Sequence, residues 1–136
     1  MLAEICLTIA ISIKINDGIV LASDSASTLL AISPDASVAN QQPQVFNVYN
    51  NADKVFNLKK GVPIGAITWG AGSIGQASIS TILKDLRKIF TDGDEENHPN
   101  WKLDRKTFTV EAVAEKLKRF VFSELYSAAF TDPARP

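Results

Sequence analysis

The sequence predicts an α+β fold in which antiparallel strands from two hairpins precede two helices. Three observations predict this class: apolar residues alternate from Leu7 to Ile15, a tight-turn signal follows at Asn16-Asp17-Gly18, and apolar residues recur at helical spacing after Gly72. Strands come first and helices later, which favours α+β over alternating βαβ units. With 136 residues, 46% of them hydrophobic and 21% charged, residues 1–136 are expected to form a single globular domain.

The first predicted hairpin occupies the N-terminal region. From Leu7 to Ile15 the odd positions are leucine or isoleucine and the even positions are threonine, alanine, serine or lysine, which is typical of a strand with one dry face. Asn16-Asp17-Gly18 supplies the positive φ of a tight turn. Ile19 to Ala22 returns as a mostly apolar strand, and we expect it to be central in a sheet.

The second half of the chain predicts another hairpin and then helices. Residues 54–68 form two short apolar runs around Lys59-Lys60-Gly61. Apolar spacing from Ile74 to Ile89 predicts a helix of about four turns. Thr109 is expected to cap a second helix, which ends at Asp132-Pro133.

Two connecting segments lack a regular period. Residues 33–51 contain prolines and many Gln, Asn and Ser residues and are predicted to be a long loop. Residues 91–106 are interpreted as a charged linker in which His98 is solvated. Trp69 and Trp101 are interpreted as packing residues.

Composition narrows the classes of function. The net charge is −1 and the basic residues are dispersed, so we expect no nucleic-acid partner. Cys6 is the single cysteine, which excludes an internal disulfide and fits a reducing compartment. One histidine and one cysteine far apart give no metal-ligand cluster, and we expect no metal and no cofactor. The N-terminal residues alternate and include Glu4, unlike a signal peptide, so the prediction is a cytoplasmic protein without a membrane partner.

Three polar residues could meet at one end of the predicted sheet. They are Thr8, Asp24 sixteen positions later, and Lys54 at the start of the second hairpin. A threonine hydroxyl needs an adjacent base, which its own α-amine supplies when the threonine begins the chain. The pKa of that amine is about 7.7 to 8.0, a lysine cation nearby favours its neutral form, and a carboxylate orients the lysine. Catalysis in this scheme requires removal of Met1 to Leu7.

A glycine turn after the fourth predicted strand supports two interpretations. Backbone N–H groups at Gly70 or Gly72 could face a developing oxyanion. Gly70, Gly72 and Gly75 also match G-x-G-x-x-G, the dinucleotide fingerprint. The charged residues after Phe90 replace the apolar strand that such a fold needs, so a nucleotide-binding module remains a remote alternative.

The sequence segments around Thr8, Asp24 and Lys54, and their order along the chain, resemble those of the proteasome β-subunit family of N-terminal-nucleophile hydrolases. Thr8 stands at the position of the family's nucleophile. The stretch KINDGIVLASDSAST resembles the family segment that ends in an aspartate, a serine and a substrate-contacting threonine, here Asp24, Ser25 and Thr28. The segment DKVFNL resembles the one that holds its lysine, here Lys54.

The resemblance implies a threonine-type peptidase or amidohydrolase that acts on peptides or proteins within a homo-oligomeric ring. It also implies an αββα sandwich with further strands after the second helix. Because the sequence stops at Pro136, we expect a truncated sandwich, in effect the N-terminal half of the domain. Ile9, Ala10 and Ala26 depart from the residues usual in the family. Because MLAEICL precedes Thr8 and the second half is missing, a noncatalytic ring or scaffold subunit, or an inactive fragment, is the alternative.

Overall fold

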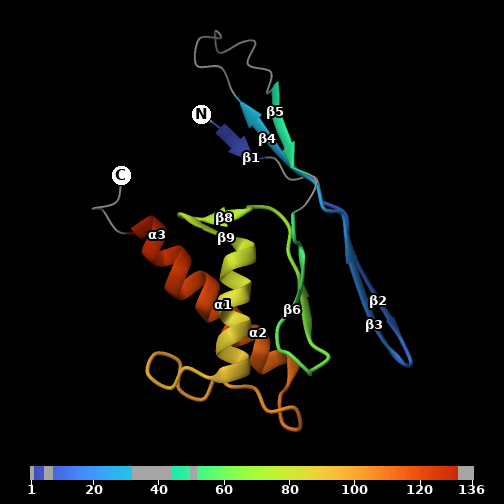
Figure 1. Ribbon diagram of the computed structural model, residues 1–136, viewed down its shortest axis with the longest axis vertical. Helices are drawn as coiled ribbons and strands as arrows, with labels where there is room; N and C mark the ends of the chain where they lie inside the picture. Colours follow the sequence, from blue (N-terminus) through green and yellow to red (C-terminus); the bar gives the residue numbers. More distant parts are fainter. Residues whose placement is uncertain (1, 5–7, 32–43, 50–51, 132–136) are drawn as a thin grey trace. The chain divides into compact units, whose positions relative to one another are not determined.

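The computed structural model describes residues 2–4, 8–31, 44–49 and 52–131, and it divides into two compact units. Unit 1 consists of Met1–Val55 and Ile67–Gly72, and unit 2 of Phe56–Ala66 and Ser73–Pro136. Antiparallel strand pairs occur first along the chain and helices follow (Figure 1). The α+β class is therefore confirmed. The division into two units differs from the single domain that the sequence predicts.

The predicted N-terminal hairpin forms in unit 1. Strands β2 (Ala10–Ile15) and β3 (Gly18–Ser23) pair antiparallel, from Ala10 opposite Ser23 to Ile15 opposite Gly18. Asn16 and Asp17 make the turn between them at the predicted place, but none of Asn16, Asp17 and Gly18 has the predicted positive φ. In the described residues β3 pairs with β2 alone, so the expectation of a central strand is wrong.

The apolar face of this hairpin is exposed, so the prediction of a dry face is wrong. The register places Ile11 beside Ala22 and Ile13 beside Val20 on one face. Ile9, Ile11, Ile13, Ile15 and Val20 are each between 47% and 67% exposed. Each strand of a two-stranded hairpin pairs with one other strand only. The alternating pattern therefore forms an apolar face, but the hairpin alone does not bury it.

A three-stranded antiparallel sheet also belongs to unit 1. It has the order β1 (Leu2–Glu4), β4 (Ser27–Ala31), β5 (Gln44–Tyr49). Strand β5 lies within the predicted loop 33–51, which corrects that part of the prediction. The run QVFNVY is rich in β-branched and aromatic residues, and this strand propensity outweighs the polar composition of its neighbours. Residues 33–43, 50 and 51 of the predicted loop lie outside the described residues.

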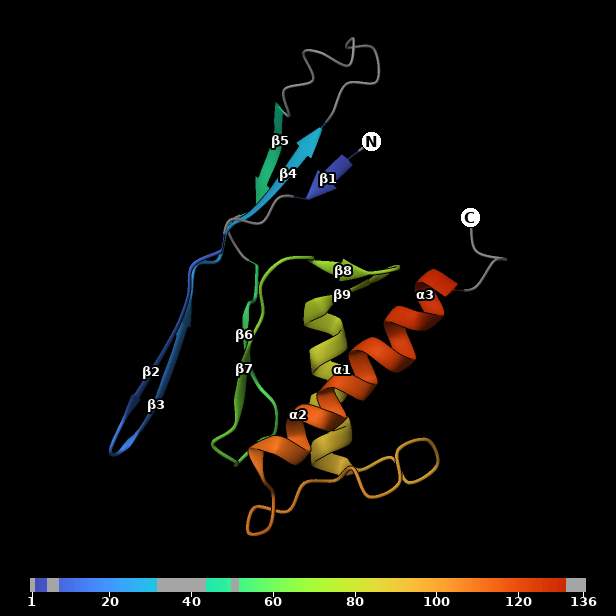
Figure 2. The same cartoon turned by 180° about the vertical axis from the view of Figure 1, so that it is seen from behind.

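The second hairpin and a smaller one lead to the helices. Strands β6 (Val55–Asn57) and β7 (Gly65–Ile67) pair as predicted. Strands β8 (Ser73–Ile74) and β9 (Ala77–Ser78) form the smaller hairpin, and β9 leads directly into helix α1 (Figure 2).

Helix α1 (Ile79–Asp92) begins later than the predicted start at Ile74. Ser78 is its N-cap, because the Ser78 hydroxyl accepts a hydrogen bond from the Thr81 N–H. The β8–β9 hairpin takes up the first residues of the predicted apolar stripe, and a serine with extended backbone provides the actual start of the helix.

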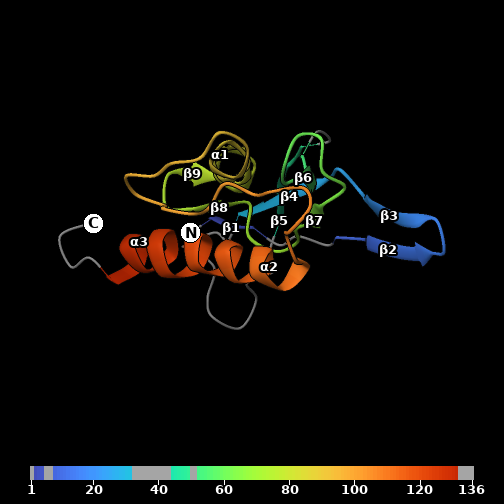
Figure 3. The same ribbon diagram turned by 90° about the horizontal axis from the view of Figure 1, so that it is seen from below.

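Residues 110–131 of unit 2 form one continuous helical segment (Figure 3). It comprises α2 (Val110–Lys118), a π-helical stretch η1 (Arg119–Tyr126) and α3 (Ser127–Thr131). Thr109 caps it as predicted, since its hydroxyl accepts a hydrogen bond from the Ala112 N–H. The predicted stop at Asp132-Pro133 lies outside the described residues.

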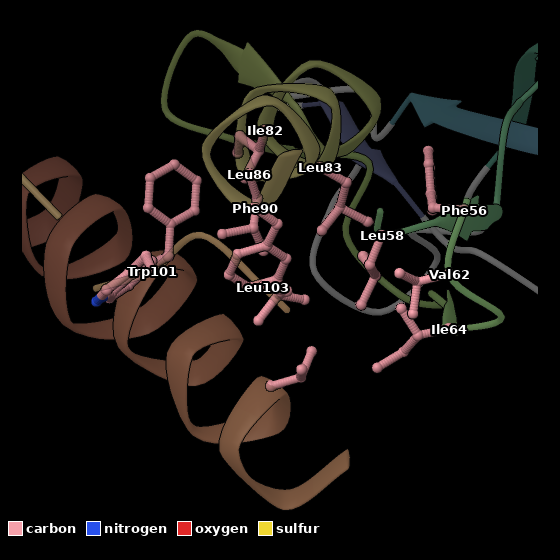
Figure 4. Packing of buried hydrophobic residues seen from close by; sticks show 12 residues of the cluster. Phe56, Leu58, Val62, Ile64, Ile82, Leu83, Leu86, Phe90, Trp101 and Leu103 are labelled. Atoms are coloured by element: carbon pink, nitrogen blue, oxygen red, sulfur yellow. The ribbon is translucent and has the colours of Figure 1, made fainter. Parts of the chain in front are cut away.

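The hydrophobic core of unit 2 joins the β6–β7 hairpin, α1, α2 and η1 (Figure 4). Its buried members are Phe56, Leu58, Val62, Ile64, Ile82, Leu83, Leu86, Phe90, Trp101, Leu103, Val113 and Phe120. Trp101 and Leu103 come from the predicted charged linker 91–106, which is therefore wrong as a description of a solvated segment. Trp101 packs as predicted, whereas Trp69 is 73% exposed and does not.

Candidate active site

The three polar residues chosen from the sequence meet in unit 1. The Lys54 Nζ lies 3.1 Å from the Thr8 Oγ1 and 3.2 Å from each carboxylate oxygen of Asp24. It also donates to the Ala26 carbonyl oxygen at 2.6 Å. The predicted proximity of hydroxyl, ammonium group and carboxylate is thus present, and the catalytic roles of these groups remain a prediction.

The N-terminal hairpin sets the distance between Thr8 and Asp24. The antiparallel pairing continues one step past β2 and β3, because the Asp24 N–H donates to the Ile9 carbonyl at 3.1 Å. The Ile9 N–H in turn donates to Asp24 Oδ1 at 3.0 Å. A hairpin with a two-residue turn therefore brings the residue before one strand beside the residue after the other.

Lys54 enters the site from the residue immediately before β6. Its backbone is held by the Thr68 N–H, which donates to the Lys54 carbonyl at 2.8 Å. The side chain of Lys54 is only 6% exposed. An ammonium group has three N–H donors, and here they reach the Thr8 hydroxyl, the Asp24 carboxylate and the Ala26 carbonyl. A charged Lys54 offers no lone pair, so it can polarise the hydroxyl but cannot take its proton.

Asp24 is held in its ionised form. Burial would raise the pKa of its carboxyl, but the hydrogen bond from the Ile9 N–H and the interactions with Lys54 outweigh burial, and the pKa lies below its ordinary value. The side chain of Asp24 is 26% exposed. An ionised Asp24 fixes the position of the Lys54 ammonium group without competing for the Thr8 proton.

Sequence reasoning missed two backbone contributions to this site. The Ala26 carbonyl receives a Lys54 donor, and the Ile9 N–H binds Asp24. Backbone groups are the same at every non-proline residue, so residue type gave no signal for either contact. The hairpin register would have placed Ile9 opposite Asp24.

The other predicted site residues, which are Gly70, Gly72 and Thr28, also belong to unit 1. Gly70 and Gly72 lie in the segment that follows Thr68, and Gly70 has a left-handed φ of 87°. Thr28 is half-buried in β4, opposite Val48. The oxyanion and substrate roles assigned to these residues remain predictions.

The geometry at Gly75 differs from that of a dinucleotide fingerprint. In such a fingerprint the glycines form the turn between a strand and the helix that binds the pyrophosphate. Here Gly75 lies in the turn between β8 and β9, and α1 starts only after Ser78. The turn closes a hairpin instead of opening a helix, which removes the basis for the nucleotide alternative.

A second polar cluster, which the sequence did not indicate, lies in unit 2. His98 is buried, with 9% exposed, so its predicted solvation is wrong. Its Nδ1 lies 2.9 Å from Asp94 Oδ2, and its Nε2 lies 2.9 Å from Glu124 Oε2. The ring also contacts Trp101 and Phe120, with centroid distances of 4.6 and 5.6 Å. These aromatic neighbours exclude water from the imidazole.

Neither cluster is a metal centre of the usual kind. Within the described ranges, no group of three or more His, Cys, Asp or Glu side chains has an arrangement that could hold a metal ion.

None of the helices in the described part of the chain combines the length and apolar character needed to cross a bilayer.

Comparisons of the chain with protein-family models, with curated proteins and with solved structures found no match.

Proposed function

We propose that this chain is a threonine-type N-terminal-nucleophile hydrolase, a peptidase or amidohydrolase subunit whose nucleophile is Thr8. The observation that carries the proposal is the 3.1 Å hydrogen bond from the Lys54 Nζ to the Thr8 Oγ1. The Thr8 hydroxyl accepts the third N–H donor of this buried ammonium group, so the same contact satisfies Lys54 and polarises the hydroxyl. A hydroxyl at that place is suited to activation.

The proposed reaction begins when cleavage of the Leu7–Thr8 bond frees the α-amine of Thr8. The neutral amine takes the hydroxyl proton as Thr8 Oγ1 attacks the carbonyl carbon of an amide, and the tetrahedral intermediate collapses to an ester as the protonated leaving amine departs. Water then hydrolyses the ester and restores the hydroxyl. Atoms and charges balance with water as the only co-reactant.

Lys54 and Asp24 assist this reaction without exchanging protons. The Lys54 ammonium group stabilises negative charge that develops on Thr8 Oγ1, and it favours the neutral form of the adjacent amine. Asp24 holds the ammonium group in place through contacts of 3.2 Å. Gly70 and Gly72 would supply N–H donors to the oxyanion, and Thr28 would contact the backbone of the substrate.

The finer parts of the proposal follow from the motifs. We assign the chain to a proteasome-like αββα sandwich, with peptides or proteins as substrates, a homo-oligomeric ring as the assembly and the cytoplasm as the location. Two features support this assignment: the order of hydroxyl, carboxylate and lysine along the chain, and the hairpin that joins the first two.

A second candidate function is a noncatalytic subunit with the same fold. The observation that favours it is that Thr8 is preceded by seven residues in the sequence, so its nitrogen is part of a peptide bond. In that state the Asp24–Lys54 pair would serve only to join the ends of two hairpins.

The test combines N-terminal sequencing and intact mass with hydrolysis of a peptide-amide library. We expect a fraction of chains to begin at Thr8 and only that fraction to hydrolyse amides. Thr8→Ala abolishes turnover, while Ser12→Ala, which removes an exposed hydroxyl from the same hairpin, leaves it unchanged. Chains that all keep Leu7, or a Thr8→Ala variant with full turnover, would overturn the proposal.

A further inference from the structure

His98 is the single histidine of the chain, and it connects two segments of unit 2. On one side it contacts Asp94, four positions earlier, through both side chain and backbone, since the His98 N–H donates to the Asp94 carbonyl at 2.7 Å. On the other side it contacts Glu124 in the π-helical stretch. The cluster takes no part in the proposed function.

The number of protons on the imidazole decides whether both contacts are hydrogen bonds. A neutral imidazole has one N–H donor, and an ionised carboxylate accepts only. Both ring nitrogens lie 2.9 Å from a carboxylate oxygen, so both contacts can be satisfied only when the ring carries two protons and a positive charge. Loss of one proton leaves a carboxylate facing a nitrogen lone pair.

The charged groups around the ring favour the protonated state. Asp94 contacts Nδ1 and Glu124 contacts Nε2, and both side chains are less than 35% exposed. A positively charged side chain, Arg119, also contacts this cluster. Its Nε donates to Glu124 Oε1 at 3.2 Å, and its guanidinium lies 5.6 Å from the centroid of the Trp101 ring. Arg119 thus binds the carboxylate on the side away from His98.

We propose that the Asp94–His98–Glu124 cluster is a pH-operated latch that fastens the segment before Trp101 to the π-helical stretch. Protonated His98 holds both carboxylates and closes the latch. Deprotonation leaves the ring with one N–H donor. When that donor stays on Asp94, the contact with Glu124 is lost and the segment is released from η1. Because Trp101 and Leu103 follow this segment closely in the chain, opening reaches the edge of the core.

The direction of the pKa shift favours the closed latch. Burial would lower the pKa of His98, but the hydrogen bonds and charges of Glu124 and Asp94 outweigh burial and raise it above 6.5. A raised pKa in the folded state means that the stabilisation is complete below pH 6.5 and is lost as pH rises through the folded value.

The experiment is an NMR titration of the intact chain, in which one imidazole gives one unambiguous signal. We expect a titration midpoint above 6.5. Amide hydrogen exchange, measured over the same pH range, reports opening at the His98 and Trp101 amides. Their opening equilibrium constants should rise by up to about tenfold per pH unit between 6.5 and the midpoint, while those of Leu86 and Phe90 in α1 stay constant.

Two variants separate the latch from general destabilisation. Glu124→Gln should lower the midpoint, whereas Glu115→Gln, an exposed position of α2, should leave it unchanged. Asp94→Asn provides the same test if Glu124→Gln does not fold. A midpoint at or below 6.5, or the same pH response at His98 and Leu86, would overturn the proposal.

Discussion

Lys54 in unit 1 and His98 in unit 2 are the two buried polar side chains among the described residues, and their partners differ in kind. Lys54 contacts one carboxylate, one backbone carbonyl and one hydroxyl. His98 contacts two carboxylates. Carboxylates therefore offset the positive charge of both side chains. Of the two, only Lys54 also donates a hydrogen bond to a group that can act as a nucleophile.

Under the proposed function, this difference distinguishes a catalytic cluster from a structural one. In the His98 cluster both ring contacts are with carboxylates, which offset the cost of burying a charged ring. In the Lys54 cluster one of the three ammonium donors goes to the Thr8 hydroxyl, the group that the proposal makes the nucleophile. Three measurements test this contrast, in order of decreasing effect.

The largest expected effect is on catalysis. Lys54→Met removes the charge beside Thr8, and we expect kcat/KM for amide hydrolysis per processed chain to fall by about 10²- to 10³-fold. Lys14→Met is the control, because Lys14 is an exposed lysine of the same hairpin and is outside the site. Wild-type turnover in Lys54→Met would mean that the bond to Thr8 has no catalytic role.

A smaller effect is expected on stability in unit 2. His98→Phe keeps a flat ring against Trp101 and Phe120 but removes both N–H donors. At pH 6 we expect the free energy of unfolding in urea to fall by about 1–3 kcal/mol, because two carboxylates lose their partner. The deficit should shrink as pH rises through the raised pKa of His98. An equal deficit at all pH values would contradict a structural role for the charged ring.

The smallest expected effect is on the titration of Asp24 at low pH. The lowered pKa of Asp24 means that its stabilising contribution is present above pH 3.8 and is lost as pH falls through the folded value. We expect carboxyl NMR to place the midpoint of Asp24 below 3.8, and Lys54→Met to raise it. A midpoint that does not respond to Lys54→Met would show that the ion pair has no influence on Asp24.

The proximity of Thr8 and Asp24 could be predicted from the sequence because short-range rules control it. Alternation and the Asn16-Asp17-Gly18 turn fix the hairpin, and the hairpin places Thr8 near Asp24. Lys54 is harder to place, because a long segment separates it from Asp24, and its choice depends on the assumption that the two predicted hairpins lie side by side. The pairing of distant segments depends on tertiary contacts, which local patterns do not encode.

The errors have the same physical origin. The segment 91–106 looks like a solvated linker because charged residues surround His98, Trp101 and Leu103. Burial of these three depends on the facing helices α1 and η1, and no local period reports it. The start of α1 was predicted too early because the residues around Gly75 satisfy both a helical stripe and a short hairpin.

The uncovered isoleucine row of the β2–β3 hairpin has a practical consequence for handling the protein. Sulfate and other strongly hydrated anions are excluded from protein surfaces and strengthen the association of apolar groups. Ile9, Ile11 and Ile13 present such a surface along one strand of the hairpin and the residue before it. Crystallisation from sulfate would accordingly favour contacts through this row, and low-salt buffers would keep copies apart.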